Sequence, residues 1–121
     1  VATSVGHDSH NLVIAGTNDA DIACAANRVI ANEGGLAIAL DGQIVADLPL
    51  QIGGLMSTLP LEEVDARLEA MKQILADWGI SGEIDPFMTL SFVSLPVIPA
   101  LRLNTYGVID VNAQKVVKAS F

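Results

Sequence analysis

The sequence contains few positive charges. Six Lys and Arg residues stand against fourteen Asp and Glu residues, which gives a formal net charge of −8. The six cations are scattered along the chain at Arg28, Arg67, Lys72, Arg102, Lys115 and Lys118. Nucleic acids and anionic membranes are bound by clusters of Lys and Arg that neutralise phosphates. The sequence therefore predicts that neither is a partner of this protein.

Cysteine and long apolar runs are scarce as well. The single cysteine, Cys24, cannot form an internal disulfide, so nothing in the sequence indicates an oxidising compartment. We interpret Cys24 as a small buried hydrophobic residue, because it lies in an alanine-rich run. No run of about 18 apolar residues could span a membrane, and no basic segment followed by an apolar one opens the chain as a signal peptide would. We expect a cytoplasmic protein.

Apolar residues, in contrast, are abundant. They make up 51% of the 121 residues, charged residues make up 17%, and the mean hydropathy is +0.49. Average soluble chains contain about 25% charged residues. Either one surface normally packs against another structure, or an unusual share of aliphatic residues is buried. The length suits one domain with one core, so we predict a single domain over residues 1–121.

Residues 11–33 show the pattern of a strand followed by a helix. The apolar run 11–16 predicts a short buried strand. From Asp19 to Glu33, apolar residues fall on one face of a helix, and Thr17-Asn18-Asp19 supplies side chains that can cap its free amides. Gly34-Gly35 can adopt the left-handed conformation that ends helices, so we predict the helix to stop there.

A hairpin follows this helix. Asp41-Gly42 is typical of a tight two-residue turn that requires positive φ, and it separates apolar strands at residues 36–40 and 43–48. Alternation within the second strand places three apolar residues on one side of the sheet: Ile44, Ala46 and Leu48.

The second half of the chain predicts one helix and two strands. Apolar residues at steps of three and four between Pro60 and Trp78 indicate an amphipathic helix with Trp78 in the core, and Gly79 can end it. The β-favouring run 87–95 predicts a strand, and a last strand is expected near residues 115–121. The element order β-α-β-β-α-β indicates an α/β (α+β) fold, with a mixed or antiparallel sheet of four to five strands and two main helices on one face.

The most polar segment of the chain is His7-Asp8-Ser9-His10-Asn11, which contains both histidines. The simplest interpretation is a polar turn in which Asp8 or Ser9 caps backbone amides. A second interpretation is contact with a ligand or a neighbouring domain. A metal site would need a third protein ligand beside the two imidazoles. Asp8 could supply it, but in an extended segment its side chain would point the other way. A Ser-His-Asp triad rarely forms from adjacent residues. Composition and spacing alone do not identify a reaction.

Further short segments follow one another over nearly the whole chain: Ser4 to Asn11, Gly16-Thr17-Asn18-Asp19, Asn27-Arg28, Gly34-Gly35, Asp41-Gly42, Leu48-Pro49-Leu50, Gly54-Leu55-Met56-Ser57, Pro86 to Phe92 and Leu95 to Pro99. Together they resemble the C-terminal domain of adenine deaminases, which are members of the amidohydrolase superfamily. Several segments in a constant order are more specific than any single motif.

This resemblance implies a parent enzyme that hydrolyses adenine to hypoxanthine and ammonia, a reaction of purine metabolism and adenine catabolism. A divalent metal (manganese, iron or zinc) would activate water in a (β/α)8 barrel of that enzyme. The present chain has no His-x-His motif such as that barrel uses, and it has far fewer than the ~250 residues of such a barrel. We therefore expect no catalytic residue, metal or other cofactor in this chain, and no activity of the chain alone.

The same resemblance implies an accessory role. The domain would pack on the amidohydrolase barrel and help either to complete the substrate site or to build a homo-oligomer. Its candidate residues for contact with the substrate site or an interface are His7, Asp8, Ser9, His10 and Asn11. The alternatives are a free-standing purine-binding or regulatory module and a dimerisation domain.

Overall fold

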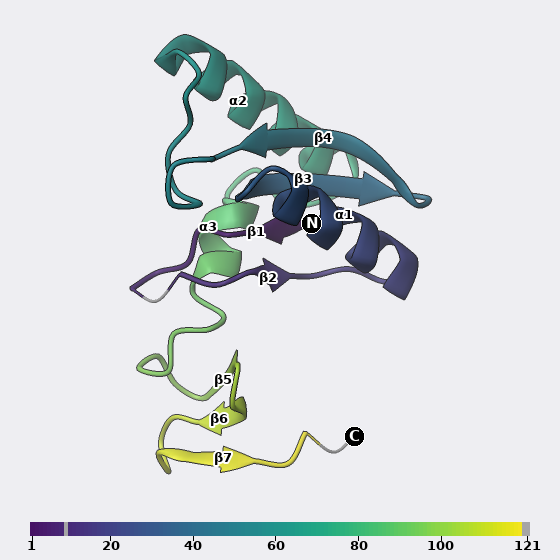
Figure 1. Ribbon diagram of the computed structural model, residues 1–121. Helices are drawn as coiled ribbons and strands as arrows, with labels where there is room; N and C mark the ends of the chain where they lie inside the picture. The colour runs from purple at the N-terminus through teal and green to yellow at the C-terminus, as the bar shows by residue number, and fades with distance from the viewer. Residues whose placement is uncertain (9, 120–121) are drawn as a thin grey trace.

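The chain forms two antiparallel sheets and three helices over the residues that the computed structural model describes, 1–8 and 10–119 (Figure 1). The larger sheet has the strand order β2 (Val13–Ile14), β1 (Ala2–Thr3), β3 (Gly35–Leu40) and β4 (Gln43–Pro49). The smaller sheet has the order β5 (Leu101–Asn104), β6 (Gly107–Asp110) and β7 (Lys115–Val117). The helices are α1 (Asp19–Ala31), α2 (Leu61–Asp77) and α3 (Pro86–Ser91). The predicted class, an α/β fold with a four-stranded sheet and two main helices, is confirmed.

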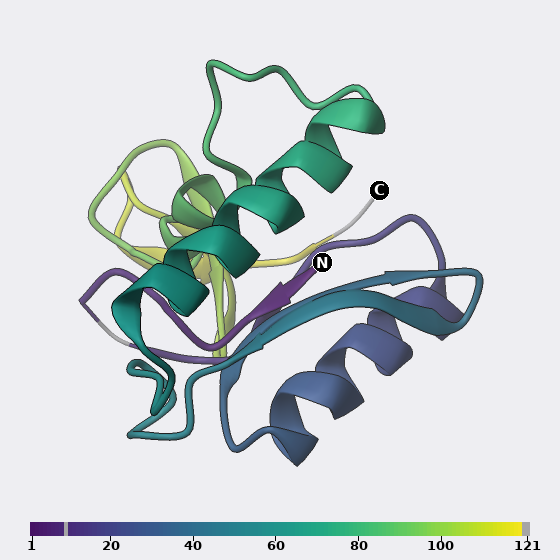
Figure 2. The same cartoon turned by 90° about the horizontal axis from the view of Figure 1, so that it is seen from above.

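The two main helices cover opposite faces of the larger sheet (Figure 2). Leu36 and Ile38 of β3 pack in the cluster that contains the buried side chains of α2, whereas Ala37 and Ala39 pack with those of α1. The prediction that both helices lie on one face is therefore wrong. Because β3 is buried on both faces, its sequence is a continuous apolar run. Such a run does not show that its small residues face one helix and its large residues face the other.

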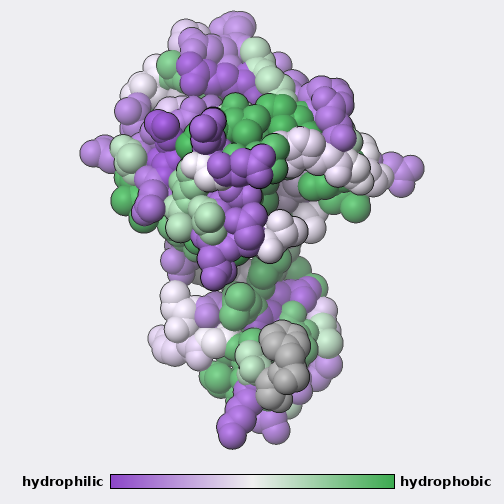
Figure 3. Space-filling view, turned by 90° about the vertical axis from the view of Figure 1, so that its right-hand side faces the viewer, coloured by the Kyte–Doolittle hydropathy of each residue, from purple (hydrophilic) through white to green (hydrophobic). Residues whose placement is uncertain are grey.

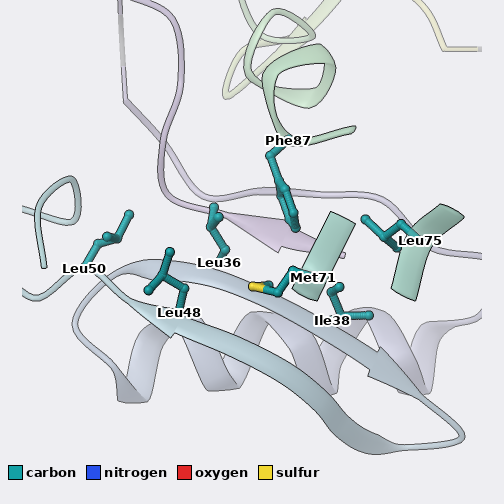
Figure 4. Packing of buried hydrophobic residues seen from close by; sticks show 7 residues of the cluster. All are labelled: Leu36, Ile38, Leu48, Leu50, Met71, Leu75 and Phe87. Carbon is teal, nitrogen blue, oxygen red and sulfur yellow. The ribbon is translucent and has the colours of Figure 1, made fainter. Parts of the chain in front are cut away.

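The main hydrophobic core lies between the larger sheet, α2 and α3 (Figure 4). Ile38, Met71 and Leu75 are among its fully enclosed side chains, and Phe87 reaches into it from α3. A second, smaller cluster on the α1 side consists of Ala2, Ala25, Val29, Ala37 and Ala39. These short side chains let α1 lie close to the sheet.

The predicted hairpin between β3 and β4 is present, with Asp41-Gly42 at positive φ in its turn. A β-bulge at Val45 shifts the pairing register within it. Because of the extra residue, Ile44 packs with the cluster on the α1 side, whereas Ala46 and Leu48 pack on the α2 side. The predicted grouping of these three residues on one side is therefore wrong for Ile44.

Cys24 lies on α1 at the edge of the smaller cluster and is half-buried rather than buried. Its Sγ–H donates a weak hydrogen bond to the Gly42 carbonyl at 3.3 Å. It packs as a small hydrophobic residue, as predicted, although its burial is incomplete.

Helix α1 begins at the predicted cap. The side chain of Asn18 accepts a hydrogen bond from the backbone N–H of Asp21 at 2.8 Å. At the other end, the N–H groups of Glu33 and Gly34 donate to carbonyls of the last turn in the Schellman pattern. The residue in the left-handed conformation is Glu33, with φ +60°, so the cap stands one residue before the predicted glycine pair.

Asp21 links α1 to the turn between β3 and β4. Its carboxylate accepts hydrogen bonds from the Gly42 N–H at 2.7 Å and from the Asn18 side-chain amide at 2.8 Å. These bonds favour the ionised form and lower the pKa of Asp21 from its ordinary value of 3.8. A carboxyl group with a lowered folded-state pKa stabilises the fold above its unfolded pKa. That stability is lost as the pH falls through the folded pKa.

We predict that Asp21→Asn narrows the difference in Tm between neutral and acidic solution. Asparagine keeps the size of the side chain but has no charge to lose below about pH 4. Circular dichroism melts at about pH 7 and about pH 2.5 measure the difference, with Asp65→Asn on the exposed side of α2 as the control. A difference equal to that of the unmodified chain would contradict this role of Asp21.

Helix α2 is one residue shorter at each end than the predicted range of 60–78. Gly79 follows it with φ +94° and donates its N–H to the Ala76 carbonyl, as expected of a glycine cap. Trp78 is 45% exposed, so its predicted place in the core is wrong. The main cluster contains no residue of α2 beyond Leu75, so Trp78 lies past the end of the core. Neither α2 nor any other helix in the described part of the chain is long and apolar enough to cross a membrane.

A helix, α3, replaces the strand predicted for residues 87–95. The Asp85 carboxylate accepts a hydrogen bond from the Met88 N–H at 2.9 Å. Pro86 occupies the first helical turn, where a missing N–H is tolerated. The strand prediction fails because a helix of six residues is too short to display a helical period, while its composition favours strands.

Residues 101–117 form β5, β6 and β7, an antiparallel meander that we call the C-terminal arm. The arm extends away from the larger sheet on the side of α3 (Figure 1). Its strand β7 confirms the last strand expected near residues 115–121, of which 120 and 121 lie outside the described residues. Strand β1, only two residues long, has no counterpart among the predicted strands.

Candidate functional site

The polar segment His7–Asn11 lies in the connection between β1 and β2. These strands pair with each other in the larger sheet, so the connection is held at both ends. It passes beside α3 (Figure 1), and the backbone N–H of His7 donates to the Ser91 carbonyl at 3.0 Å. The sheet holds the two ends of the connection, and α3 holds the backbone of His7. We call this segment the histidine loop.

Ser4 fixes the start of this connection. Its hydroxyl donates to the Gly54 carbonyl at 2.6 Å and accepts from the Gly35 N–H at 2.7 Å. One side chain therefore ties the end of β1 both to β3 and to the loop that follows β4.

We predict that Ser4→Ala lowers the free energy of unfolding by about 1–3 kcal/mol, because it leaves a part-buried donor and a part-buried acceptor without their partner. Urea unfolding measures the loss. Ser81→Ala is the control, since the Ser81 hydroxyl accepts a single hydrogen bond at 3.3 Å on the exposed surface. It should change stability by less than about 0.5 kcal/mol. Equal losses in the two variants would contradict the anchoring role of Ser4.

The His7 ring stacks on Phe92, which directly follows α3. The ring centroids lie 4.8 Å apart and the ring planes are inclined by 26°. The imidazole is exposed, and its nitrogens make no hydrogen bond to a described residue. The stack therefore orients the ring while both nitrogens can reach a partner outside the chain.

His10 is oriented by its own loop. Its Nδ1 accepts a hydrogen bond from the Gly6 N–H at 3.2 Å, so Nε2 is the ring atom left for an outside partner. Asp8 is exposed and has φ +68°, a left-handed conformation that aspartate tolerates. Ser9 lies outside the described residues. The interpretation of Ser9 as a backbone cap therefore stays untested, as does the disfavoured Ser-His-Asp triad.

A cavity of about 450 Å³ begins at Asn11. Its wall runs from β2 past the turn after α3 to the C-terminal arm, and Ser94 and Asn104 are among its polar residues. The Ser94 hydroxyl is buried and has no hydrogen-bond partner among the described residues. The rest of the wall is mostly apolar, including Leu12 and Leu103. A cavity of this size is large enough for a small molecule.

The described residues do not assemble a metal site. No group of three His, Cys, Asp or Glu side chains that could hold an ion occurs among them. One of the four histidine nitrogens, Nδ1 of His10, is already used within the loop.

Two neighbours of the histidine loop, Ser91 and Phe92, are not among the predicted site residues. They come from residues 87–95, which were predicted as a strand. Because of that error, the sequence did not predict that Ser91 and Phe92 lie at the end of a helix. The helix-start signal in Asp85-Pro86 could have located this helix. No signal in the sequence indicates that the loop packs on it.

Comparison with known proteins relates nearly the whole chain to one family. The family model described as "Adenine deaminase C-terminal domain" matches residues 1–115. The chain is 48% identical, over 99% of its length, to adenine deaminase 2 of Carboxydothermus hydrogenoformans, of which it covers 21%. It is 56% identical over 92% of its length to the adenine deaminase of Kosmotoga olearia, and 46% identical over 93% to that of Geobacillus kaustophilus, covering 19% of each. The chain therefore spans about a fifth of the length of the curated relatives that it matches.

Proposed function

Because the chain belongs to the adenine deaminase C-terminal domain family, we propose that it is an accessory domain of a longer adenine deaminase and packs on the part of that protein that carries the active site. The reaction of the parent protein is the hydrolysis of adenine to hypoxanthine and ammonia. The strongest support for this proposal is that the chain matches only a small part of each relative. Between 92% and 99% of the chain aligns with these relatives, yet it covers only 19–21% of their length.

The surface of the chain is consistent with packing on a larger body. Large hydrophobic side chains are exposed on several elements, and they include Met56, Leu61, Trp78, Val97, Leu101 and Tyr106. Exposed apolar residues mark a site of interaction with another protein where they form a contiguous patch. The high apolar and low charged content of the sequence agrees with this use of the surface.

We place the divalent metal of the parent reaction in the remainder of the protein. When bound there, manganese, iron or zinc would generate the nucleophilic water that attacks the purine carbon bearing the amino group. The donor atoms of this chain do not fit such an ion, because His10 Nδ1 accepts the Gly6 N–H and no three metal-binding side chains converge within residues 1–8 and 10–119. We therefore assign no step of the reaction to a metal held by this chain.

The histidine loop is our candidate for contact with the substrate site or with the neighbouring domain. Its anchors support this role, since Ser91 holds the backbone of His7 and Phe92 holds its ring. The free nitrogens of His7 and Nε2 of His10 could then donate or accept hydrogen bonds outside the chain. Asp8, Ser9 and Asn11 complete the proposed contact segment.

The cavity at Asn11 favours a second candidate function, a purine-binding or regulatory module. Its volume of about 450 Å³ exceeds the need of a purine, and Asn11 and Asn104 offer side-chain amides at its wall. Calorimetric titration of the chain with adenine and with hypoxanthine tests this candidate. Saturable binding of either purine would support it, and the absence of binding would remove it. The third candidate, a dimerisation domain, is tested by analytical ultracentrifugation of the chain. A dimer in solution would support it, and a monomer would remove it.

Co-expression tests the accessory role. The remainder of the full-length protein is produced alone and together with this chain as a separate polypeptide. We expect the two to purify as a complex, and the remainder alone to lose deaminase activity by about tenfold or more, or to aggregate through its uncovered apolar surface. A remainder that is fully active and does not bind the chain would contradict the proposal.

A further inference from the structure

The C-terminal arm has no hydrophobic core of its own. Every residue from 101 to 117 is at least partly exposed, and Leu101 and Leu103 are 54% and 55% exposed. Val108 pairs with Leu103 and with Val117, so these apolar residues share one face of the arm. Short strands need a packed hydrophobic face to be stable. The arm therefore presents an exposed apolar face that packing against another segment would stabilise.

A cavity separates part of this face from the end of α3. It has a volume of about 450 Å³ and lies between Phe92 and Val93 on one side and Leu101 and Leu103 on the other. Figure 3 shows hydrophobic surface at the narrow junction between the main body and the arm. Among the described residues on the wall of this cavity, Arg102 is the one that carries a charge.

The charge of Arg102 has no counter-ion in the described part of the chain. The guanidinium donates to the carbonyls of Leu101 at 2.6 Å and Pro99 at 3.2 Å, and none of the ion pairs among the described residues includes it. A guanidinium offers five N–H donors and pairs with a carboxylate through two of them at once. The cavity thus combines apolar walls with a cation that has no carboxylate partner among residues 1–8 and 10–119.

We propose that this cavity receives an apolar segment that carries an Asp or Glu carboxylate and belongs to the part of the full-length protein with the active site. The inference rests on the proposed function and names the surface through which the two parts meet. The net charge of the chain is −8, so Arg102 is a local point of attraction for an acidic group on a surface that otherwise repels it. A segment of the same polypeptide is present at high effective concentration, which favours it over a second copy of this chain.

Zero-length cross-linking in the full-length protein tests this proposal. In the Arg102→Lys variant, a carbodiimide activates a carboxylate in contact with the new ammonium group. An amide bond then forms, and the carbodiimide leaves as its urea. Peptide mass spectrometry identifies the carboxylate joined to position 102, and we expect it outside residues 1–121. Arg67→Lys is the matched control, because Arg67 lies 2.7 Å from Glu63 on α2 and should link to that residue inside the domain.

A second measurement uses charge reversal. We expect Arg102→Glu to accelerate hydrogen exchange of residues 101–117 in the full-length protein by about tenfold or more, because the arm loses its docked partner. Arg67→Glu should leave exchange of the arm unchanged.

Different results would contradict the accessory role of the domain and the docking of a carboxylate beside Arg102. A missing link from position 102, or a link confined to this domain in the same or another copy, would overturn the docking of a carboxylate in the cavity. Links from Lys72, Lys115 or Lys118 to the remainder of the protein would then still support the accessory role. Absence of every link between this domain and the remainder would count against both proposals.

Discussion

Replacing Gly35 by alanine is expected to remove most of the stability of this domain. Gly35 opens β3 with φ +134°, a conformation that other residues rarely adopt. A Cβ at this position would also overlap the carbonyl oxygen of Leu48 on β4. The two strands must then separate at this end, which disturbs the core that Leu48 enters. We expect a loss of about 4 kcal/mol or more in the free energy of unfolding, measured by urea titration.

Two other glycines separate the cost of the backbone conformation from the cost of the steric overlap at Gly35. Gly42 has φ +73° but no atom within 4 Å of a Cβ, so Gly42→Ala should cost only the backbone penalty of about 1–2 kcal/mol. Gly82 has open space and no positive φ, so Gly82→Ala should be neutral or slightly stabilising. A loss for Gly35→Ala no greater than that for Gly42→Ala would contradict the close approach of β4 to Gly35.

His7→Phe and His10→Asn, each made in the full-length protein, are expected to lower kcat/KM for adenine by about tenfold. His7→Phe keeps an aromatic ring stacked on Phe92 but removes both ring nitrogens. His10→Asn keeps an acceptor for the Gly6 N–H but removes Nε2. Loss of one hydrogen bond of about 1.4 kcal/mol corresponds to this factor. Steady-state kinetics of ammonia release measure the effect.

Asp65→Asn, on an exposed position of α2, is the control for these kinetics. The Tm of each variant shows whether the loop and its anchors remain intact. If both histidine variants keep the kcat/KM and the Tm of the unmodified protein, the histidine loop does not contact the substrate site. It would then be the polar turn that its composition most simply indicates.

The features that the sequence predicts best are those with a local cause. Asn18 caps α1 and Asp41-Gly42 forms a tight turn because each depends on a few neighbouring atoms. Gly79 ends α2 for the same reason. Trp78 differs, because its burial depends on how far along α2 the core extends. The main cluster ends at Leu75, so Trp78 stays exposed. The opposite placement of α1 and α2 likewise depends on packing against both faces of β3.

The candidate site likewise combines features that are set locally with features that depend on the complete fold. That His7 and His10 lie in one loop is evident from their positions in the sequence. Its anchors join residues far apart in the chain, as in the hydrogen bond from Ser4 to Gly54 and the stack of His7 on Phe92. Such contacts depend on the complete fold, and the misassigned segment at residues 87–95 hid one of them. The apolar and cationic cavity beside Arg102 is a product of the same long-range packing.

We propose that this chain contributes to adenine deamination only as part of a larger protein. Ammonia release from adenine by the purified chain, measured together with its metal content, tests this claim most directly. We predict no ammonia release and no stoichiometric metal, while the full-length protein is active. Stoichiometric metal together with ammonia release would contradict the claim, and His7, Asp8 and His10 would then be the first candidates for its ligands.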